Sequence, residues 1–340
     1  MISLYYSLWI LPGLYEIANA TIRKERARII FPLLIATICF VAIFRIGDSL
    51  PDYATYIDYI DSVTRGYEVF IESSFVWVVR TFYTDIFKEY GVFAFYAIVS
   101  IFIKMISIRK MSSLVVLAIV VYLSNIYIVQ DLIQIRAGVA SALFLFSVYY
   151  YVSNKTKVAI FLNVLAIIFH ISAIIGLIIF FFNKKSINTR VWTAFLPISF
   201  VIAALGLINA TLLKVIPGDK LSIYIITSES ESINIYNVLF LCKFAICLYI
   251  LRHGKQLSEI SKYFPLLCKI YVLSICAFLC LSPLPTLAFR SQGYLEVVEI
   301  VLFPMIAFTF SKLWLGKAVV FFYSAFSSLV LIFNTKLIRF

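Results

Sequence analysis

The feature of this sequence that most constrains its fold is a series of apolar runs, many of them about 17 residues or longer, which is enough for a helix to cross a bilayer. Hydrophobic residues make up 63% of the chain and charged residues 14%, against roughly 45–50% and about 25% in soluble domains. Only helices or closed barrels satisfy the backbone in lipid, and these runs lack the two-residue alternation of barrel strands. We therefore predict an all-α, polytopic integral membrane protein that forms a single membrane domain over residues 1–340.

About ten of these runs are predicted as transmembrane helices, and two further segments have other expected roles. The segment 158–182 is predicted as a re-entrant or short-helix pair. The aromatic segment 67–87, which carries Glu72, Arg80 and Asp85, is predicted as an amphipathic helix lying at the membrane interface. The predicted spans are Ile2–Asn19, Ile29–Phe44, Val92–Ile108, Ser112–Val129, Ala137–Val152, Val191–Asn209, Ile235–Leu251, Pro265–Leu281, Ile300–Phe310 (with an earlier start expected) and Ala318–Phe333.

The basic residues indicate which side of the membrane each loop occupies. Three clusters, at residues 23–28, 109–110 and 155–157, fall on one side if the first helix starts outside, as the positive-inside rule requires. A single crossing by residues 158–182 would move all later basic clusters outside, whereas a segment that enters and returns keeps them in the cytoplasm. We therefore favour the returning pair, with His170 at its extracytoplasmic tip.

The net charge of +12 arises from these short clusters between apolar runs. Because such clusters are topology signals, we expect membrane lipids and no nucleic acid as partners. All six cysteines lie inside apolar runs without metal-ligand spacing, so they are expected to be small core residues. The sequence also has no Gly-rich phosphate loop and no Gly-x-Ser-x-Gly elbow, and we predict neither a metal nor a cofactor.

The predicted topology brings a few polar residues to the extracytoplasmic face, in or beside the expected outer loops 46–90, 210–234 and 283–297. Arg136 opens a helix rich in small residues, where the helix N-terminus favours an anion. Arg290 follows Pro283 and Pro285, and its guanidinium can hold a phosphate with two parallel hydrogen bonds. The residues expected on this face are Arg45, Asp48, Asp52, Arg136, His170 and Arg290.

Structural alternatives exist for several of these charged residues. The sequence supports two roles for Arg136 equally: binding of an anionic substrate, or extension of the side chain to lipid head groups. His170 is costly within a membrane run, which points to a function, but a neutral histidine in a helix bundle is the alternative. Lys243 is a secondary candidate for substrate binding, whereas Lys104 and Lys269 are expected to extend toward the cytoplasmic interface.

Five short motifs in order resemble the EpsG-like branch of Wzy-type bacterial polysaccharide polymerases. The sequence departs from the family pattern at Ala137, where the family more often has Gln, and at Ser73-Ser74, where it more often has Pro-Gly. The residues that carry the resemblance are Arg45, Asp52 and Tyr56; Glu72 and Phe75; Arg136, Gly138 and Ala140; Phe169, His170, Ser172 and Ala173; and Arg290 with Tyr294.

The resemblance implies a glycosyltransferase at the extracytoplasmic face of a bacterial inner membrane. A glycan on undecaprenyl pyrophosphate would be transferred to the non-reducing end of another lipid-linked repeat unit, and a chain-length regulator protein is a further candidate partner. Arg136 and Arg290 are expected to bind pyrophosphate with help from Arg45, while Asp52 or Glu72 acts as the base and His170 positions or shares that role. Further substrate contacts are expected from Asp48, Tyr53, Tyr56, Gln134, Ser172 and Tyr294.

Three other functions remain open from the sequence. An O-antigen ligase would use similar arginine and histidine chemistry, but usually carries a larger outer loop. A membrane acyltransferase would need an acyl donor. A flippase or transporter, the alternative without catalysis, is expected to show duplicated halves and broken helices, and the sequence has no convincing internal repeat.

The topology is tested by a cysteine placed at Ile171 in a background that lacks the native six cysteines. If residues 158–182 enter and return, this cysteine faces the extracytoplasmic side and reacts with a membrane-impermeant thiol reagent in intact cells. Labelling that needs permeabilised cells contradicts the returning pair.

Overall fold

The computed structural model describes residues 10, 12–17, 24–45, 50–205 and 233–334. This part of the chain is helical and contains no strand, which confirms the all-α class. Five of its helices are long and apolar enough to cross a membrane, and five further apolar helices have 10–17 residues. The count of ten spans therefore stays a prediction. The five long helices are Lys88–Met111, Val115–Ile133, Ile135–Val152, Pro285–Thr309 and Leu313–Leu331.

The described residues divide into two compact units. The first is built from Met1–Leu177 and Glu299–Phe340, and the second from Ile178–Val298. Most of the expected first span, Ile2–Asn19, lies outside the described residues, as does most of the expected loop 210–234. Each unit is considered by itself below.

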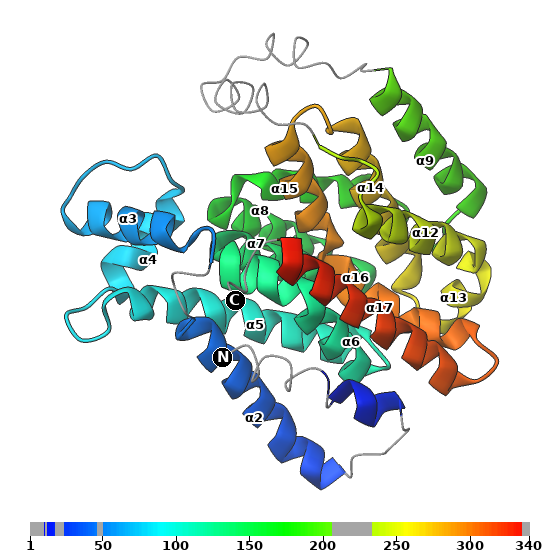
Figure 1. The fold of residues 1–340 in the computed structure, drawn as a ribbon, viewed down its shortest axis with the longest axis horizontal. Coiled ribbons are helices and arrows are strands. Elements are labelled where there is room, and N and C mark those ends of the chain that lie inside the picture. Colours follow the sequence, from blue (N-terminus) through cyan, green and yellow to red (C-terminus); the bar gives the residue numbers. More distant parts are fainter. Residues whose placement is uncertain (1–9, 11, 18–23, 46–49, 206–232, 335–340) are drawn as a thin grey trace. The chain divides into compact units, whose positions relative to one another are not determined.

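The first unit is centred on helix α7, which lies between α8 and α5 (Figure 1). Helix α2 packs against α5, while α16 and α17 pack against α6. The largest wholly buried side chains of the core are aromatic, among them Tyr96, Tyr122, Phe75 and Phe144. The helices of this unit are α2 (Lys24–Ile43), α3 (Tyr53–Thr64), α4 (Ser73–Phe82), α5 (Lys88–Met111), α6 (Val115–Val121), η2 (Tyr122–Ile133), α7 (Ile135–Val152), α8 (Thr156–Phe169), α16 (Glu299–Met305), η5 (Ile306–Thr309) and α17 (Leu313–Asn334).

The amphipathic helix predicted over residues 67–87 is shorter than expected. Only Ser73–Phe82 are helical, as α4. Its buried face is formed by Phe75, Val78 and Val79 together with Ser74, whereas Trp77 is exposed. Helix α4 packs on α5 and α8 with this face. The helix therefore covers only the stretch whose apolar side chains have a packing partner, and its place at the membrane interface remains a prediction.

The segment 158–182 consists of two helical pieces separated at His170. Helix α8 ends at Phe169, His170 has an extended backbone (φ −156°, ψ 120°), and a 3₁₀ helix, η3, covers Ile171–Phe181. A break of this kind leaves backbone groups without helical partners. Two such groups are satisfied from the start of α4: Ser74 Oγ donates to the Ile168 carbonyl (2.7 Å), and Ile171 N donates to Glu72 Oε1 (3.5 Å). The break is observed, whereas the return of the chain to the same side stays a prediction.

The second unit contains α9 and α12 to α15. Helix α14 packs against both α9 and α15. Residues 285–295, expected within an outer loop, form the helix α15, which begins with Pro285 at a position where proline is well tolerated. Its helices are α9 (Thr189–Ala204), α12 (Val238–Arg252), α13 (Gly254–Ile260), α14 (Phe264–Cys280), α15 (Pro285–Leu295) and η4 (Glu296–Val298).

A sharp corner between η2 and α7 shapes the first unit. The segment η2 is a π-helix of 12 residues, which is wider than an α-helix and is often found at functional sites. Gln134 leaves the helical conformation (φ −98°, ψ 63°), and α7 starts immediately after it. At Gly138 the two helices approach so closely that a Cβ atom would lie 2.4 Å from the Gln130 carbonyl oxygen. Glycine is therefore required there by the close approach of the two backbones.

Replacing Gly138 with Ala is expected to lower the free energy of unfolding by about 1–3 kcal/mol, because the added methyl group meets backbone that cannot move aside. Unfolding of the purified protein in one detergent measures the change. Gly293→Ala is the matched control, since a Cβ at this helical glycine meets nothing within 4 Å, and the substitution is expected to be neutral or stabilising by up to about 1 kcal/mol. Equal losses in both variants contradict the close-approach explanation.

Candidate functional site

The centre of the candidate site is Glu72, whose carboxylate contacts two basic side chains. Glu72 Oε2 forms an ion pair with Arg136 Nη1, and Glu72 Oε1 lies 3.3 Å from His170 Nδ1. The three residues come from separate elements: Glu72 directly precedes α4, Arg136 lies in the first turn of α7, and His170 separates α8 from η3. All three side chains are mostly buried, with exposed fractions of 14%, 17% and 9%.

The charge of Glu72 determines which nitrogen of His170 is basic. Burial alone would raise the pKa of Glu72, but the hydrogen bond from His170 and the positive charge of Arg136 outweigh it and lower the pKa to about 2. The carboxylate is therefore ionised at neutral pH and can only accept hydrogen bonds. Nδ1 of His170 must then carry a hydrogen, which assigns the lone pair of the neutral imidazole to Nε2.

Arg136 is held in place but retains hydrogen-bonding capacity. Its guanidinium lies 5.7 Å from the centre of the Tyr56 ring. Within the described part of the chain, its buried Nε has no hydrogen-bond partner. A cation at a helix N-terminus is opposed by the helix dipole, and the Glu72 carboxylate compensates for this. An anion that reaches Arg136 would therefore find an unused donor on a guanidinium that Glu72 already pairs and orients.

Arg45 is bound by backbone carbonyl groups, although its buried Nε, like that of Arg136, has no hydrogen-bond partner among the described residues. Its Nη1 donates to the carbonyl oxygen of Leu132 at 2.6 Å and to that of Asp131 at 3.4 Å, both at the C-terminal end of η2. Its guanidinium stacks 4.0 Å from the centre of the Phe93 ring, and Tyr53 packs on the same ring from 5.5 Å. Arg45 therefore joins the end of α2 to the η2–α7 corner.

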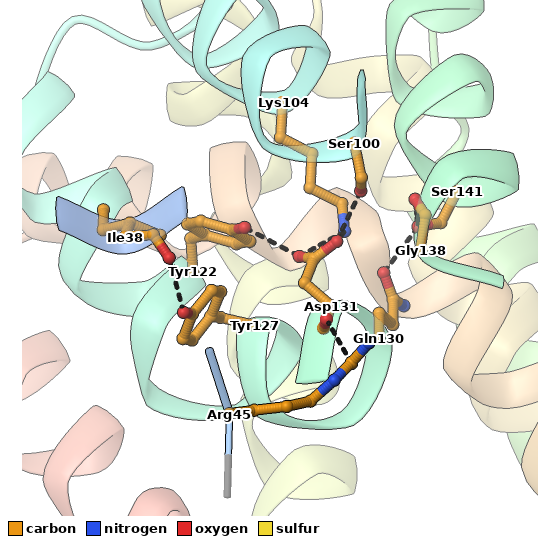
Figure 2. Close-up of polar contacts among 10 residues, drawn as sticks. All are labelled: Ile38, Arg45, Ser100, Lys104, Tyr122, Tyr127, Gln130, Asp131, Gly138 and Ser141. Carbon is orange, nitrogen blue, oxygen red and sulfur yellow. Dashed lines mark hydrogen bonds and ion pairs between the residues drawn. The ribbon is translucent and has the colours of Figure 1, made fainter. Parts of the chain in front are cut away.

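The side chain of Asp131 anchors this corner (Figure 2). Lys104 Nζ lies 2.8 and 3.0 Å from its two oxygens, Tyr122 Oη donates to it at 2.7 Å, and Ser100 Oγ donates as well. Both charged side chains are completely buried. The expectation that Lys104 extends to the membrane interface is therefore wrong: its charge is used to neutralise Asp131, because an unpaired charge inside the bundle is too costly.

Two further hydrogen bonds connect η2 to its neighbours (Figure 2). Ser141 Oγ on α7 donates to Gln130 Oε1 at 2.5 Å. Tyr127 Oη donates to the Ile38 carbonyl on α2 at 2.8 Å. The Ser141 bond, together with Asp131, fixes the direction in which α7 leaves the corner, whereas the Tyr127 bond holds η2 against α2. Arg136 lies at the start of α7, so the Ser141 bond also fixes its position.

The other predicted site residues of the first unit lie around this centre. Asp52 directly precedes α3, one turn before Tyr56, which is buried. Burial raises the pKa of Tyr56 more than the adjacent Arg136 lowers it, so the phenol stays protonated. Gln134 forms the η2–α7 corner, and Ser172 is half-buried in η3. Asp48 lies outside the described residues.

In the second unit, Arg290 and Tyr294 lie on α15, with Arg290 half-buried and Tyr294 buried. Lys243, predicted as a secondary substrate contact, pairs with Glu296 at 2.7 Å, and both side chains are buried. This pair connects α12 to η4, directly after α15. The sequence gives no local signal for it, because the partners lie 53 residues apart.

Lys269, also in the second unit, was expected to extend to the cytoplasmic interface, but it binds backbone groups of the protein instead. Its ammonium group donates to the backbone carbonyl oxygens of Asn183 and Ser186, the latter at 2.7 Å. The side chain is therefore used to hold the turn before α9. Over the residues described in both units, no group of three or more His, Cys, Asp or Glu side chains is arranged to hold a metal ion.

Comparison with known proteins identifies one family. The family model described as the EpsG family matches residues 28–339 of the chain. No curated protein and no solved structure gives a significant match. The matched range includes every residue of the candidate site.

The role of the Asp131–Lys104 pair is tested by Lys104→Met, which leaves a buried carboxylate without a counter-charge. We expect a loss of about 3–5 kcal/mol in the free energy of unfolding. The double variant Lys104→Met/Asp131→Asn removes both charges and should recover part of this loss, because an amide oxygen still accepts from Tyr122. Unfolding in detergent measures both. A double variant no more stable than the single one contradicts the account.

Proposed function

The chain belongs to the EpsG family, a family of membrane proteins of polysaccharide biosynthesis, and from this premise we propose that it is a polysaccharide polymerase. In this proposal a glycan carried on undecaprenyl pyrophosphate is transferred to the non-reducing end of a second lipid-linked repeat unit. The reaction takes place at the extracytoplasmic face of a bacterial inner membrane, with a chain-length regulator protein as a possible partner. The observation that carries the proposal is the Glu72 carboxylate between Arg136 and His170.

The leaving group of this reaction is a pyrophosphate, which gains negative charge as the glycosidic bond breaks. Preorganised positive charge at that point lowers the barrier without a covalent intermediate. Arg136 is suited to this role because Glu72 and Tyr56 orient its guanidinium, while its buried Nε has no partner among the residues described. We assign to Arg45 the task of holding the η2–α7 corner. A pyrophosphate role for Arg290 on α15 rests on the sequence alone.

The acceptor sugar must lose a hydroxyl proton as it attacks. We assign this proton to His170 Nε2, because Nδ1 is oriented by the ionised Glu72, which leaves the lone pair of Nε2 to accept the proton. Glu72 itself, with a pKa of about 2, is a weak base. The acceptor oxygen then bonds to the anomeric carbon, the bond from that carbon to the pyrophosphate oxygen breaks, and the pyrophosphate leaves with the electron pair. Asp52, before α3, is the alternative base.

The reaction class is tested by incubating the purified protein with purified lipid-linked repeat units. A polymerase gives a ladder of products that grows by one repeat at a time. Joining of glycan to lipid A without a ladder indicates a ligase, and transfer of an acyl group indicates an acyltransferase. Accumulation of repeat units on the cytoplasmic side after gene deletion indicates a flippase. Each of these outcomes replaces the polymerase proposal.

The pyrophosphate roles predict a strong difference between arginine and lysine. An arginine that only neutralises lipid head groups can be replaced by lysine, whereas a pyrophosphate contact that uses the planar guanidinium fork cannot. We expect Arg136→Lys and Arg290→Lys each to slow chain extension by about thirty- to a thousand-fold, the effect of losing about 2–4 kcal/mol of transition-state stabilisation.

The measurement is the initial rate of chain extension at matched amounts of folded protein. Arg109→Lys is the control, because Arg109 is exposed at the end of α5 and contacts the Phe31 ring, which a lysine can also do. Near wild-type rates in both test variants rule out the assigned arginine roles.

A further inference from the structure

Tyr96 is a large buried side chain at the candidate site that sequence reasoning did not select. It lies on α5 and is 1% exposed. Its ring packs against Phe75 at 6.1 Å and meets Phe169 edge to face at 6.3 Å. Phe75 lies three residues after Glu72, and Phe169 directly precedes His170. The ring is therefore packed against both elements that bring Glu72 and His170 together.

The hydroxyl group of Tyr96 has no hydrogen-bond partner within the described residues. Leaving a buried hydroxyl unsatisfied costs about 1–3 kcal/mol, so such groups usually have a reason. Two other buried tyrosines of the same unit show the ordinary arrangement: Tyr122 donates to Asp131 and Tyr127 to the Ile38 carbonyl. Tyr96 differs from both in that its ring is as well packed while its hydroxyl is not used by the fold.

The surroundings of this hydroxyl identify what it can bind. It interacts electrostatically with Arg136, Glu72 and Tyr56. The buried Nε of Arg136 is a second donor without a partner in the described structure. The Tyr96 hydroxyl and the Arg136 Nε are thus two donors without partners. They match a ligand that is negatively charged and has several acceptor oxygens, as a phosphate group has. A single sugar hydroxyl would satisfy the tyrosine but has only one oxygen, whereas a phosphate offers a separate acceptor oxygen to each donor.

We propose that the Tyr96 hydroxyl donates a hydrogen bond to a phosphate oxygen of the ligand bound by Arg136, and that Tyr96 is a ligand-binding residue of this site. The inference rests on the proposed function for the identity of the ligand, which is the pyrophosphate of the lipid-linked donor. Glu72 holds Arg136 through Nη1 and Tyr56 accepts a further side-chain hydrogen bond, while the ligand takes the Nε donor and the Tyr96 hydroxyl. The phenol thus adds a neutral donor where a further cation would disturb the Glu72–His170 contact.

The test uses Tyr96→Phe, which removes the hydroxyl and keeps the ring. Binding of undecaprenyl pyrophosphate to the full-length protein in detergent is measured by calorimetry, and stability by thermal unfolding without ligand. We expect binding roughly ten- to a hundred-fold weaker, as for a lost hydrogen bond to a charged group. We expect stability equal to or above that of the wild type, because the lost hydroxyl had no protein partner. If Tyr96 had only a structural role, the substitution would lower ligand affinity only together with thermal stability.

Tyr127→Phe is the matched control, because it removes a hydroxyl that the fold does use. It should lower stability and leave binding unchanged. Unchanged binding by Tyr96→Phe, or a loss of stability as large as in the control, overturns the inference. The inference is also overturned if Tyr96→Phe keeps its affinity for undecaprenyl pyrophosphate but no longer binds a repeat-unit oligosaccharide without phosphate. The hydroxyl would then contact sugar.

The test separates this inference from the proposed function. Wild-type protein that binds undecaprenyl pyrophosphate through Tyr96 but forms no ladder of products supports the Tyr96 contact and contradicts the polymerase. A ladder formed equally well by Tyr96→Phe, with equal affinity for the lipid, supports the polymerase and contradicts the Tyr96 contact. Wild-type protein that does not bind the lipid contradicts both.

Discussion

The buried ion pair between Asp131 and Lys104 is the interaction on which the rest of the first unit depends. A charge inside a helix bundle is tolerated only when it is paired and hydrogen-bonded, and here Tyr122 and Ser100 complete the environment of the carboxylate. The pair connects η2 to α5, and the carbonyl groups beside it receive the guanidinium of Arg45. The ends of α2 and η2 are thus held against α5 at the point where η2 turns sharply into α7.

A second constraint is the break in the helical segment at His170. Breaking a helix exposes backbone groups that need partners, and Ser74 and Glu72 at the start of α4 provide two of them. The residue that satisfies the backbone is also the residue that orients His170 and pairs with Arg136. Structural and proposed chemical roles therefore meet in one carboxylate, and Glu72 cannot be changed without affecting both.

The arginines of the chain differ in the partners that the fold gives them. Arg45 donates its Nη1 to two carbonyl oxygens of η2 and stacks on Phe93, whereas Arg136 pairs with the Glu72 carboxylate beside His170. Each arginine keeps a buried Nε without a hydrogen-bond partner among the described residues. The difference in their partners supports a role for Arg136 in the chemistry of the site and a role for Arg45 in holding the corner. Because both are arginines at a helix end, composition and spacing cannot separate them.

The sequence by itself determined the all-helical membrane class, since apolar runs in lipid have few alternatives, and its short motifs singled out Glu72, Arg136 and His170. The ends of helices did not follow from the sequence: α4 covers Ser73–Phe82, a shorter range than the predicted 67–87, because packing against neighbouring helices contributes to where a helix ends. Only the tertiary structure decided that Glu72 lies between Arg136 and His170, that Lys104 neutralises Asp131, and that the Tyr96 hydroxyl is left unused. The physical reason is distance along the chain, because these partners lie 27 to 98 residues apart and helical periodicity specifies which face of a helix is buried but not which side chain meets it.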